Sequence, residues 1–313
     1  MRGQRVRILE LPTGVAVTRI ARGYLGAAAR ALRQLERRGN EEALHAFRVA
    51  IRRLRSQLRA YRPWLGKAAG RKVRRGLRRL TRATNEARDA DVALAWIAPL
   101  RPQLLREERP GFDWLRRRLA KRRKTANRSA ASALGPQFAD VARRLHKRMN
   151  GATIRAPDAY RDVFLELLAV HAGELRERLA AIAASQDDRD IHRARIQVKR
   201  LRYLIEPLRS ELDDAARSVV KRLKKIQNLL GELHDMQVLQ NELVSARSQA
   251  TLDRALGIAA LSAHARERRL ALLGQLRRSW LADGNRTLDS GLRSLAAAAS
   301  SSRASQPRSQ SAR

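Results

Sequence analysis

The sequence predicts an all-α protein built from two pseudosymmetric antiparallel helical bundles, and three observations support this fold class. Helix-favouring Ala, Leu, Arg, Glu and Lys dominate the 313 residues. The alternating Val, Ile, Thr and Tyr runs that are typical of strands are missing. Finally, one half of the chain repeats the residue pattern of the other, so a whole group of helices is expected twice.

The duplication is clearest in two pairs of segments. LHAFRVAIRRLRSQL (44–58) aligns with IHRARIQVKRLRYLI (191–205) at an offset of 147 residues. VRRGLRRLTRATNEARDADV (73–92) aligns with VVKRLKKIQNLLGELHDMQV (219–238) at an offset of 146. The first alignment matches His45, Arg48, Arg52 and Arg55 with His192, Arg195, Lys199 and Arg202. The second matches Arg75, Arg78, Arg79 and Asp89 with Lys221, Lys224, Lys225 and Asp235.

Proline, glycine and capping residues set the helix limits expected in the first half, residues 18–150. Pro12 and Gly14 favour an irregular arm over residues 1–17, and helical periodicity begins near Thr18 and stops at Gly39. Asn40 is the expected N-cap of the next helix, which ends before Pro63. Proline-rich breaks then divide the rest into helices expected over about 68–97, 112–134 and 137–149.

The second half is expected over residues 157–285, after a linker at 151–156. Its helices are predicted over about 158–184, 190–211, 215–247 and 252–282. Because Ser, Ala and Arg dominate the end of the chain, residues 286–313 are predicted to form a disordered basic tail.

The duplicated helices carry separate apolar and cationic faces. At roughly 100° per residue, Phe47, Ile51, Leu54 and Leu58 share one arc of their helix. The adjoining arc is basic and comprises His45, Arg48, Arg52, Arg55 and Arg59. The next segment has the cations Arg75, Arg78, Arg79 and Arg82 opposite an apolar face, and its repeat has Lys221, Lys224 and Lys225. We therefore expect four cationic arcs, two per half, to line one groove.

The charge balance indicates an anionic partner. The chain has 67 Lys and Arg against 30 Asp and Glu, a formal net charge of +37, which favours association with polyanions. A basic stripe is usually only a solvated face. Here the same positions are basic in both halves, and the stripes lack the acids at i+4 that a solubility face normally carries.

Two pairs of residues on the cationic side have two interpretations each. His45 and His192 either serve local packing or capping, or donate to a bound anion; neighbouring cations would disfavour their charged form in the free protein. Anion binding would then strengthen as pH falls. Asp89 and Asp235 are expected to pair with a neighbouring Arg or Lys and to fix its rotamer, and catalysis by them is the alternative.

Signatures of other protein classes are missing. There is no cysteine, and no run approaches the roughly 18 apolar residues that a membrane span requires. The motifs GxxxxGK[ST], HExxH and GxSxG do not occur. We expect a cytoplasmic protein with no metal, no cofactor and no catalytic residues.

At these basic segments the chain resembles the CHAD family, the conserved-histidine α-helical domain. The resemblance covers about residues 18–285 and rests on the two copies of a histidine followed by an arginine-rich helix, each with a later RDADV or LHDMQV segment. It implies two helical bundles around a basic central channel that binds inorganic polyphosphate. The binding residues that it implies are those of the matched pattern: His45, Arg48, Arg52, Arg55, Arg75, Arg79 and Arg82 in the first half, and His192, Arg195, Lys199, Arg202, Lys221 and Lys225 in the second. Asn228 stands opposite Arg82. The periodicity of the stripes adds Arg59, Arg78 and Lys224 to the predicted binding residues.

Polyphosphate is also chemically plausible, since a chain of repeating anions requires only densely spaced donors. Aromatic residues make up 4% of the sequence, which disfavours a stacking platform for single-stranded nucleic acid. The expected function is non-catalytic polyphosphate binding, as an accessory or targeting protein at polyphosphate granules. Two alternatives stay open: a basic protein that binds nucleic acid non-specifically at low salt, and a polyphosphate or triphosphate hydrolase.

Overall fold

The structure is a computed structural model that describes residues 7–38, 41–66, 70–151, 158–185, 187–282 and 284–301. Across these ranges the chain is helical, and the only β pairing is an isolated bridge between Pro12 and Ala159. The predicted all-α fold class is confirmed. The expected cap Asn40, the linker residues 152–156 and the tail residues 302–313 lie outside the described residues.

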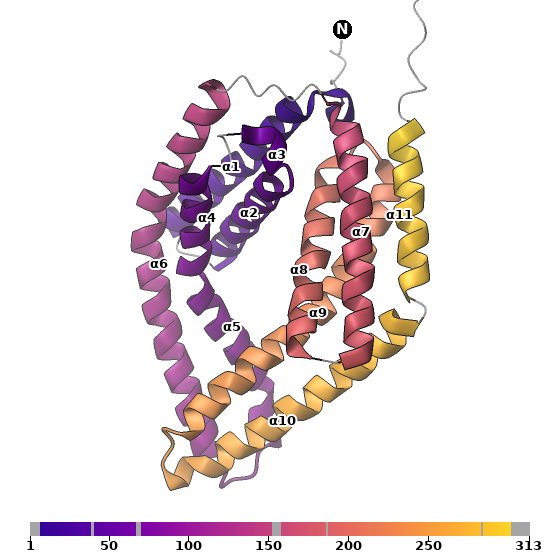
Figure 1. Cartoon of the computed structure of the whole chain (residues 1–313). Helices are drawn as coiled ribbons and strands as arrows, with labels where there is room; N and C mark the ends of the chain where they lie inside the picture. Colours follow the sequence, from indigo (N-terminus) through magenta and orange to yellow (C-terminus); the bar gives the residue numbers. More distant parts are fainter. Residues whose placement is uncertain are drawn as a thin grey trace, which may run out of the picture.

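In the described residues of the first half there are six α-helices and two short 3-10 segments. They are η1 (Ile8–Glu10), α1 (Thr13–Arg38), α2 (Glu41–Ala60), α3 (Arg62–Leu65), α4 (Arg71–Ala83), α5 (Asn85–Ile97), η3 (Ala98–Gln103) and α6 (Arg109–Gly151). In Figure 1 most of these helices lie on the left side, with α6 as the long outer helix, while η1 lies at the top beside α7.

The described part of the second half contains five α-helices. They are α7 (Tyr160–Ser185), α8 (Asp188–Ile205), α9 (Asp213–Arg247), α10 (Leu252–Leu276) and α11 (Gly284–Ser301), with a 3-10 turn η4 (Glu206–Leu208) and a π-helical turn η5 (Arg277–Ala282). Helices α9 and α10 extend to the lower end of the molecule, where they contact α5 and α6 of the first half (Figure 1). None of the described helices is long and apolar enough to cross a membrane.

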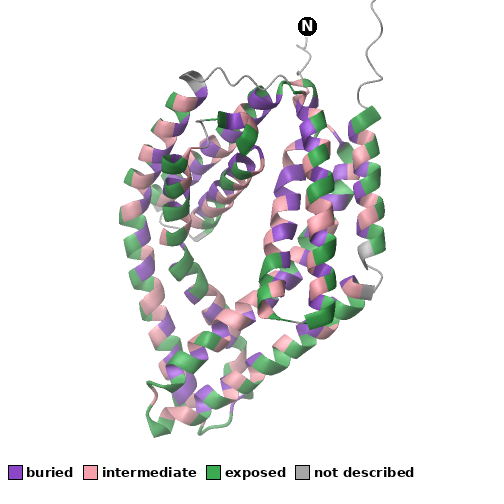
Figure 2. Cartoon of the chain, viewed as in Figure 1, coloured by how far each residue is buried: buried purple, intermediate pink, exposed green. Residues whose placement is uncertain are grey.

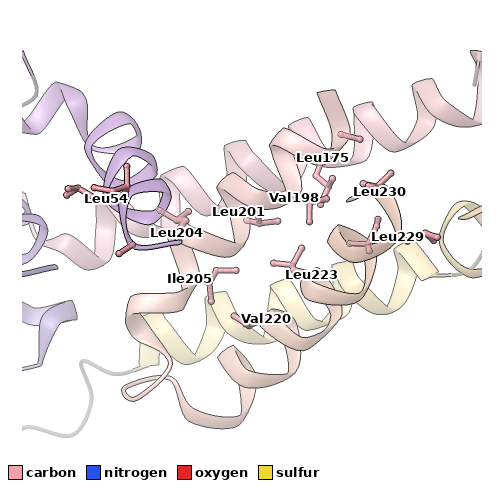
Figure 3. Packing of buried hydrophobic residues seen from close by; sticks show 14 of the residues in the cluster. Leu54, Leu175, Val198, Leu201, Leu204, Ile205, Val220, Leu223, Leu229 and Leu230 are labelled. Carbon is pink, nitrogen blue, oxygen red and sulfur yellow. The ribbon is translucent and has the colours of Figure 1, made fainter. Parts of the chain in front are cut away.

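One apolar core runs through both halves. Buried positions alternate with exposed ones around each helix, so that most helices present one buried face (Figure 2). Leu54 of α2 and Leu204 of α8 are both buried in this core, and Figure 3 shows them near each other where the halves meet. The hydrophobic effect therefore holds α2 and α8 together as part of a single core.

The long helices α6 and α10 cross at a pair of glycines. Gly111 and Gly257 lie 146 residues apart, and a Cβ atom added to either would come within 2.9 Å of the other's Cα. The same added atoms would meet the backbone oxygens of Arg254 and Glu108 at 2.3 and 2.0 Å. Only glycine permits this close approach of the two halves.

Four predicted boundaries are wrong, and tertiary contacts explain three of them. The arm was expected to extend to residue 17, but α1 begins at Thr13, whose N–H and Oγ1 donate to the Asp158 carbonyl at 2.9 and 2.8 Å. Helix α6 continues through Pro136, because Leu134, Phe138 and Val141 form one buried face that outweighs the cost of an internal proline.

Residues 286–301 were predicted to be disordered but belong to α11, where Leu288, Leu292, Leu295 and Ala299 are buried. Their spacing of four, three and four is that of a packed helix face. Alanine- and serine-rich composition concealed this periodicity. The helix expected over 68–97 is broken at Thr84, which separates α4 from α5, whereas α9 at the matched position is continuous.

Candidate anion-binding site

Helices α2 and α8, which carry the first pair of duplicated stripes, lie against each other. The buried Gln57 of α2 donates a hydrogen bond from Nε2 to the backbone oxygen of Tyr203 on α8. Nε of Arg53 lies 2.7 Å from Oε2 of Glu206, directly after α8. The two halves are therefore joined by polar contacts as well as by the core, along the helices that were expected to bind an anion.

The faces predicted for α2 are confirmed. Phe47, Ile51, Leu54 and Leu58 are all buried. On the other side His45, Arg55 and Arg59 are exposed, and Arg48 and Arg52 are half-buried. The guanidinium of Arg48 reaches the break between α4 and α5, where Nη1 donates to the Thr84 carbonyl at 2.7 Å.

The faces of α8 differ from this arrangement at one residue. Val198, Leu201 and Ile205 are buried as predicted, while His192 is exposed and Arg195 and Lys199 are half-buried. Arg202, which was predicted to bind polyphosphate, is buried instead. Its Nε lies 3.3 Å from Oε1 of Glu206, and its guanidinium carbon lies 4.8 Å from the centroid of the Tyr203 ring.

The correction at Arg202 has a cause in the sequence. Glu206 occupies the position that matches Arg59 in the first half, so the stripe ends in a carboxylate rather than in another cation. That carboxylate engages both Arg202 and Arg53. Arg202 is therefore assigned to the joint between the halves, where an ion pair with little solvent contact fixes its position.

The stripes of the two halves meet at Lys199. Burial, and after it the positive charges of Arg195 and Arg52, lower the pKa of Lys199 to about 6. Burial also lowers the pKa of Arg195, which Asp235 opposes by its negative charge and Arg52 reinforces. Arg52 comes from the first half and the other residues from the second. Helix periodicity could fix the faces but not this convergence of the two halves.

Asp89 on α5 and Asp235 on α9 lie beside the same cations. Burial raises the pKa of both carboxyl groups; Arg48 opposes this at Asp89, and Arg88 opposes it at Asp235. A terminal nitrogen of Arg88 lies 4.0 Å from a carboxylate oxygen of Asp235. The expected pairing with a neighbouring cation is thus present at Asp235, although its partner comes from the other half. The negative charge of Asp235 also raises the pKa of Asp89.

Two residues of this cluster were missed in the sequence. Arg88 lies close enough to His45 to lower its pKa, after the larger effects of burial and Arg48. His234, which the alignment of the halves matches with Arg88, has its ring centroid 5.2 Å from that of His192. Burial, and after it the charges of Arg195 and His192, lower the pKa of His234 to about 4. Arg88 and His234 directly precede the duplicated Asp89 and Asp235. This shared position next to a duplicated aspartate is the signal in the sequence that could have identified them.

The second pair of duplicated stripes lies on α4 and α9. The residues Arg75, Arg78, Arg79, Arg82, Lys221, Lys224 and Lys225 are all exposed. Arg78 joins the α2 stripe, since its charge lowers the pKa of Arg55, although less than burial and Arg59 do. Lys221 and Lys225 instead line a hollow between α9 and the end of α10. The structure thus brings cations of α2 and α8 together, with Arg78 of α4 beside Arg55, but places these two lysines at a separate feature.

Within the described part of the chain, no cluster of three or more His, Cys, Asp or Glu side chains could hold a metal ion. The cluster around Lys199 instead combines guanidinium, ammonium and imidazole groups from four helices. Such groups supply forked and single donors to oxyanions. The chemistry that this arrangement supports is recognition of a multiply charged anion.

Comparisons with known proteins identify the family. The family profile described as the CHAD domain matches residues 21–244. The fold is similar to the crystal structure of the CHAD domain from the plant Ricinus communis, with a TM-score of 0.69, 23% sequence identity, and coverage of 94% of this chain and 96% of the other. It is also similar to PptA from Streptomyces chartreusis, with a TM-score of 0.69 and 19% identity over 86% of this chain and 99% of the other. No curated protein matches the sequence.

Proposed function

Because the chain belongs to the CHAD domain family, we propose that it binds inorganic polyphosphate without transforming it, through the cations that α2 and α8 present around Lys199. The observation that carries this proposal is the convergence of Arg52, Arg195 and Lys199 from both halves, where burial and, after it, the charges of Arg195 and Arg52 lower the pKa of Lys199 to about 6. A bound anion would relieve that repulsion.

The remaining stripe residues extend this centre along the molecule. His45, Arg55 and Arg59 are exposed along α2, which rises about 1.5 Å per residue. A flexible polyanion can follow such a row, because each phosphate needs donors but no sequence-specific contact. We propose that the protein acts as an accessory or targeting protein at polyphosphate granules.

A competition titration tests the choice of partner. Long-chain polyphosphate and duplex DNA, matched in phosphate concentration, are titrated against the protein at near-physiological salt. Polyphosphate is expected to bind more tightly, because its flexible chain can follow the row of cations, whereas duplex DNA is stiff, with a persistence length of about 50 nm. Equal affinity for DNA would contradict the proposal.

Incubation with polyphosphate tests the absence of catalysis. Chain length and free phosphate are followed over time with and without Mg²⁺ and Mn²⁺. We expect no release of phosphate. Release that depends on the metal, and that is lost when Asp89 or Asp235 is replaced by Asn, would assign the protein to the hydrolases instead.

A further inference from the structure

A hollow of about 680 Å³ lies between α9 and the end of α10, and three cations line it. Lys221, Arg222 and Lys225 come from successive turns of α9. Within the described part of the chain, no carboxylate forms an ion pair with any of them. The one acid at the hollow, Glu232, is paired with Arg268 at 2.7 Å. The hollow therefore has an excess of positive charge.

Neutral polar groups form a second part of the lining. Ser218 and Asn228 project from α9, Gln275 comes from α10, and Ser279 comes from the π-helical turn η5. Hydroxyl and amide side chains both donate and accept hydrogen bonds. Inorganic polyphosphate offers acceptors but no donors at neutral pH, so it would leave the acceptor side of this lining unused.

An apolar wall completes the hollow. Leu229 and Trp280 are both nearly buried, yet both line it. Trp280 belongs to η5, where α10 widens by a π-helical turn before α11; such turns are rare and occur frequently at functional sites. A flat indole and an aliphatic side chain form a surface on which a planar ring can pack.

From these three kinds of lining we infer that the hollow binds a nucleoside phosphate, with the phosphates at Lys221, Arg222 and Lys225 and the ring toward Trp280. The volume lies within the range of about 300–1,000 Å³ that is usual for small-molecule sites. The ligand is thus a phosphorylated organic molecule, unlike the inorganic chain proposed for the α2 and α8 surface. This inference does not depend on that proposal.

The repeat supplies a matched control for the test. Lys221→Gln with Lys225→Gln removes two exposed charges from the hollow, and Arg75→Gln with Arg79→Gln removes the matched charges from α4. Binding of ATP without divalent metal is measured by calorimetry on the full chain. We expect the α9 variant to bind ATP about tenfold more weakly or worse, because charge-assisted hydrogen bonds are lost, and the α4 variant to bind it as the wild type does.

Two further measurements separate this inference from the polyphosphate proposal. Arg52→Gln with Lys199→Gln is expected to leave ATP affinity unchanged, whatever its effect on polyphosphate. Inorganic tripolyphosphate, which carries the phosphates without the nucleoside, is expected to bind the hollow more weakly than ATP does. Equal binding of ATP and tripolyphosphate, or equal loss in the α4 and α9 variants, would overturn the assignment to a nucleoside phosphate.

Discussion

Lys199 shows most clearly how single residues shape the site. The side chain is half-buried, and the charged groups that act on it are Arg195, Arg52, Asp235 and Arg202. Burial is the largest cause of the lowered pKa of Lys199, and one nearby carboxylate does not balance the three guanidinium groups that lower it further. The free protein therefore holds Lys199 largely uncharged at neutral pH, in a position where a polyanion would restore its charge.

This arrangement leads to an expected pH dependence of polyphosphate binding. The pKa of Lys199 is about 6 in the free protein, and bound phosphate would raise it. Binding then takes up a proton above pH 6, so affinity is expected to fall as pH rises, by up to about tenfold per unit for one proton. Calorimetry between pH 6 and 9 checks this. The slope should shrink in Lys199→Gln and persist in Lys121→Gln, a control on the exposed face of α6.

The lowered pKa of Lys199 also affects the stability of the free protein. The unfolded chain protonates Lys199 near its usual pKa of 10.5, whereas the folded chain does so near 6. Between these values the unfolded state binds more protons, so Lys199 destabilises the fold at neutral pH, and this cost shrinks as pH rises toward 10.5 and grows as pH falls toward 6.

Lys199→Met removes this destabilising contribution. At pH 7 its free energy of unfolding should exceed that of the wild type by on the order of 1–2 kcal/mol. Urea denaturation checks the difference, and an equal or lower stability of the variant at pH 7 would contradict the lowered pKa.

At the scale of the elements, the joint between α2 and α8 depends on Glu206. Its carboxylate holds Arg202 of α8 at 3.3 Å and Arg53 of α2 at 2.7 Å. Glu206→Gln should lower the free energy of unfolding by about 1–3 kcal/mol, since it leaves the guanidinium of Arg202 buried without a counter-charge. Thermal and urea denaturation measure this.

Glu232→Gln is the matched control for Glu206→Gln. It breaks an ion pair of similar length, 2.7 Å to Arg268, whose two side chains are about half exposed. Such pairs contribute about 0.2–1 kcal/mol. If both variants lose the same free energy of unfolding, burial is not the reason that the Glu206 contact stabilises the protein.

The elements also show what the sequence could and could not predict. The buried and cationic faces of α2 follow from local periodicity, and the structure confirms them at Phe47 and Ile51. The role of Arg202 does not follow, because its partner Glu206 matters only once α2 and α8 are packed. The passage of α6 through Pro136 likewise depends on tertiary packing, including the edge-to-face contact of Phe47 with Phe138 at 5.7 Å.

For the whole molecule, the relative placement of the halves depends on the crossing of α6 and α10 at Gly111 and Gly257. Alanine at either glycine would force the two backbones apart, and such overpacking typically costs about 1–3 kcal/mol. Helices α5 and α9 contact each other near this crossing and extend from it toward the rest of the molecule. The change should therefore also disturb the cluster of Arg52, Arg195 and Lys199.

Gly111→Ala and Gly257→Ala are therefore expected to lower both the free energy of unfolding and the affinity for polyphosphate. Gly231→Ala is the control, since a Cβ added there would meet no neighbouring atom within 4 Å. Because Gly231 lies within α9, alanine at this position should stabilise the helix by about 0.5–1 kcal/mol. A loss of stability at Gly231 as large as that at Gly111 would show that close approach is not the cause.

The convergence of the two halves could not be derived from the sequence, although the duplication predicted four cationic arcs. The arcs on α2 and α8 are brought together, as the effect of Arg52 on Lys199 indicates, and the α4 arc adds Arg78 beside Arg55. The fourth contributes Lys221 and Lys225 to a hollow formed with η5. The π-helical turn that shapes this hollow has no counterpart in the repeat pattern, so alignment of the halves could not reveal it.

The most direct test of shared polyphosphate recognition is the salt dependence of binding in two double variants. Arg52→Gln with Lys199→Gln removes one cation from each half, and Arg116→Gln with Arg117→Gln removes two exposed cations of α6 outside the stripes. For the first we expect an affinity loss of about tenfold or more and a slope of log K against log salt that is smaller by about one to two. The second should bind nearly as the wild type does, and equal losses in the two variants would contradict a polyphosphate site between α2 and α8.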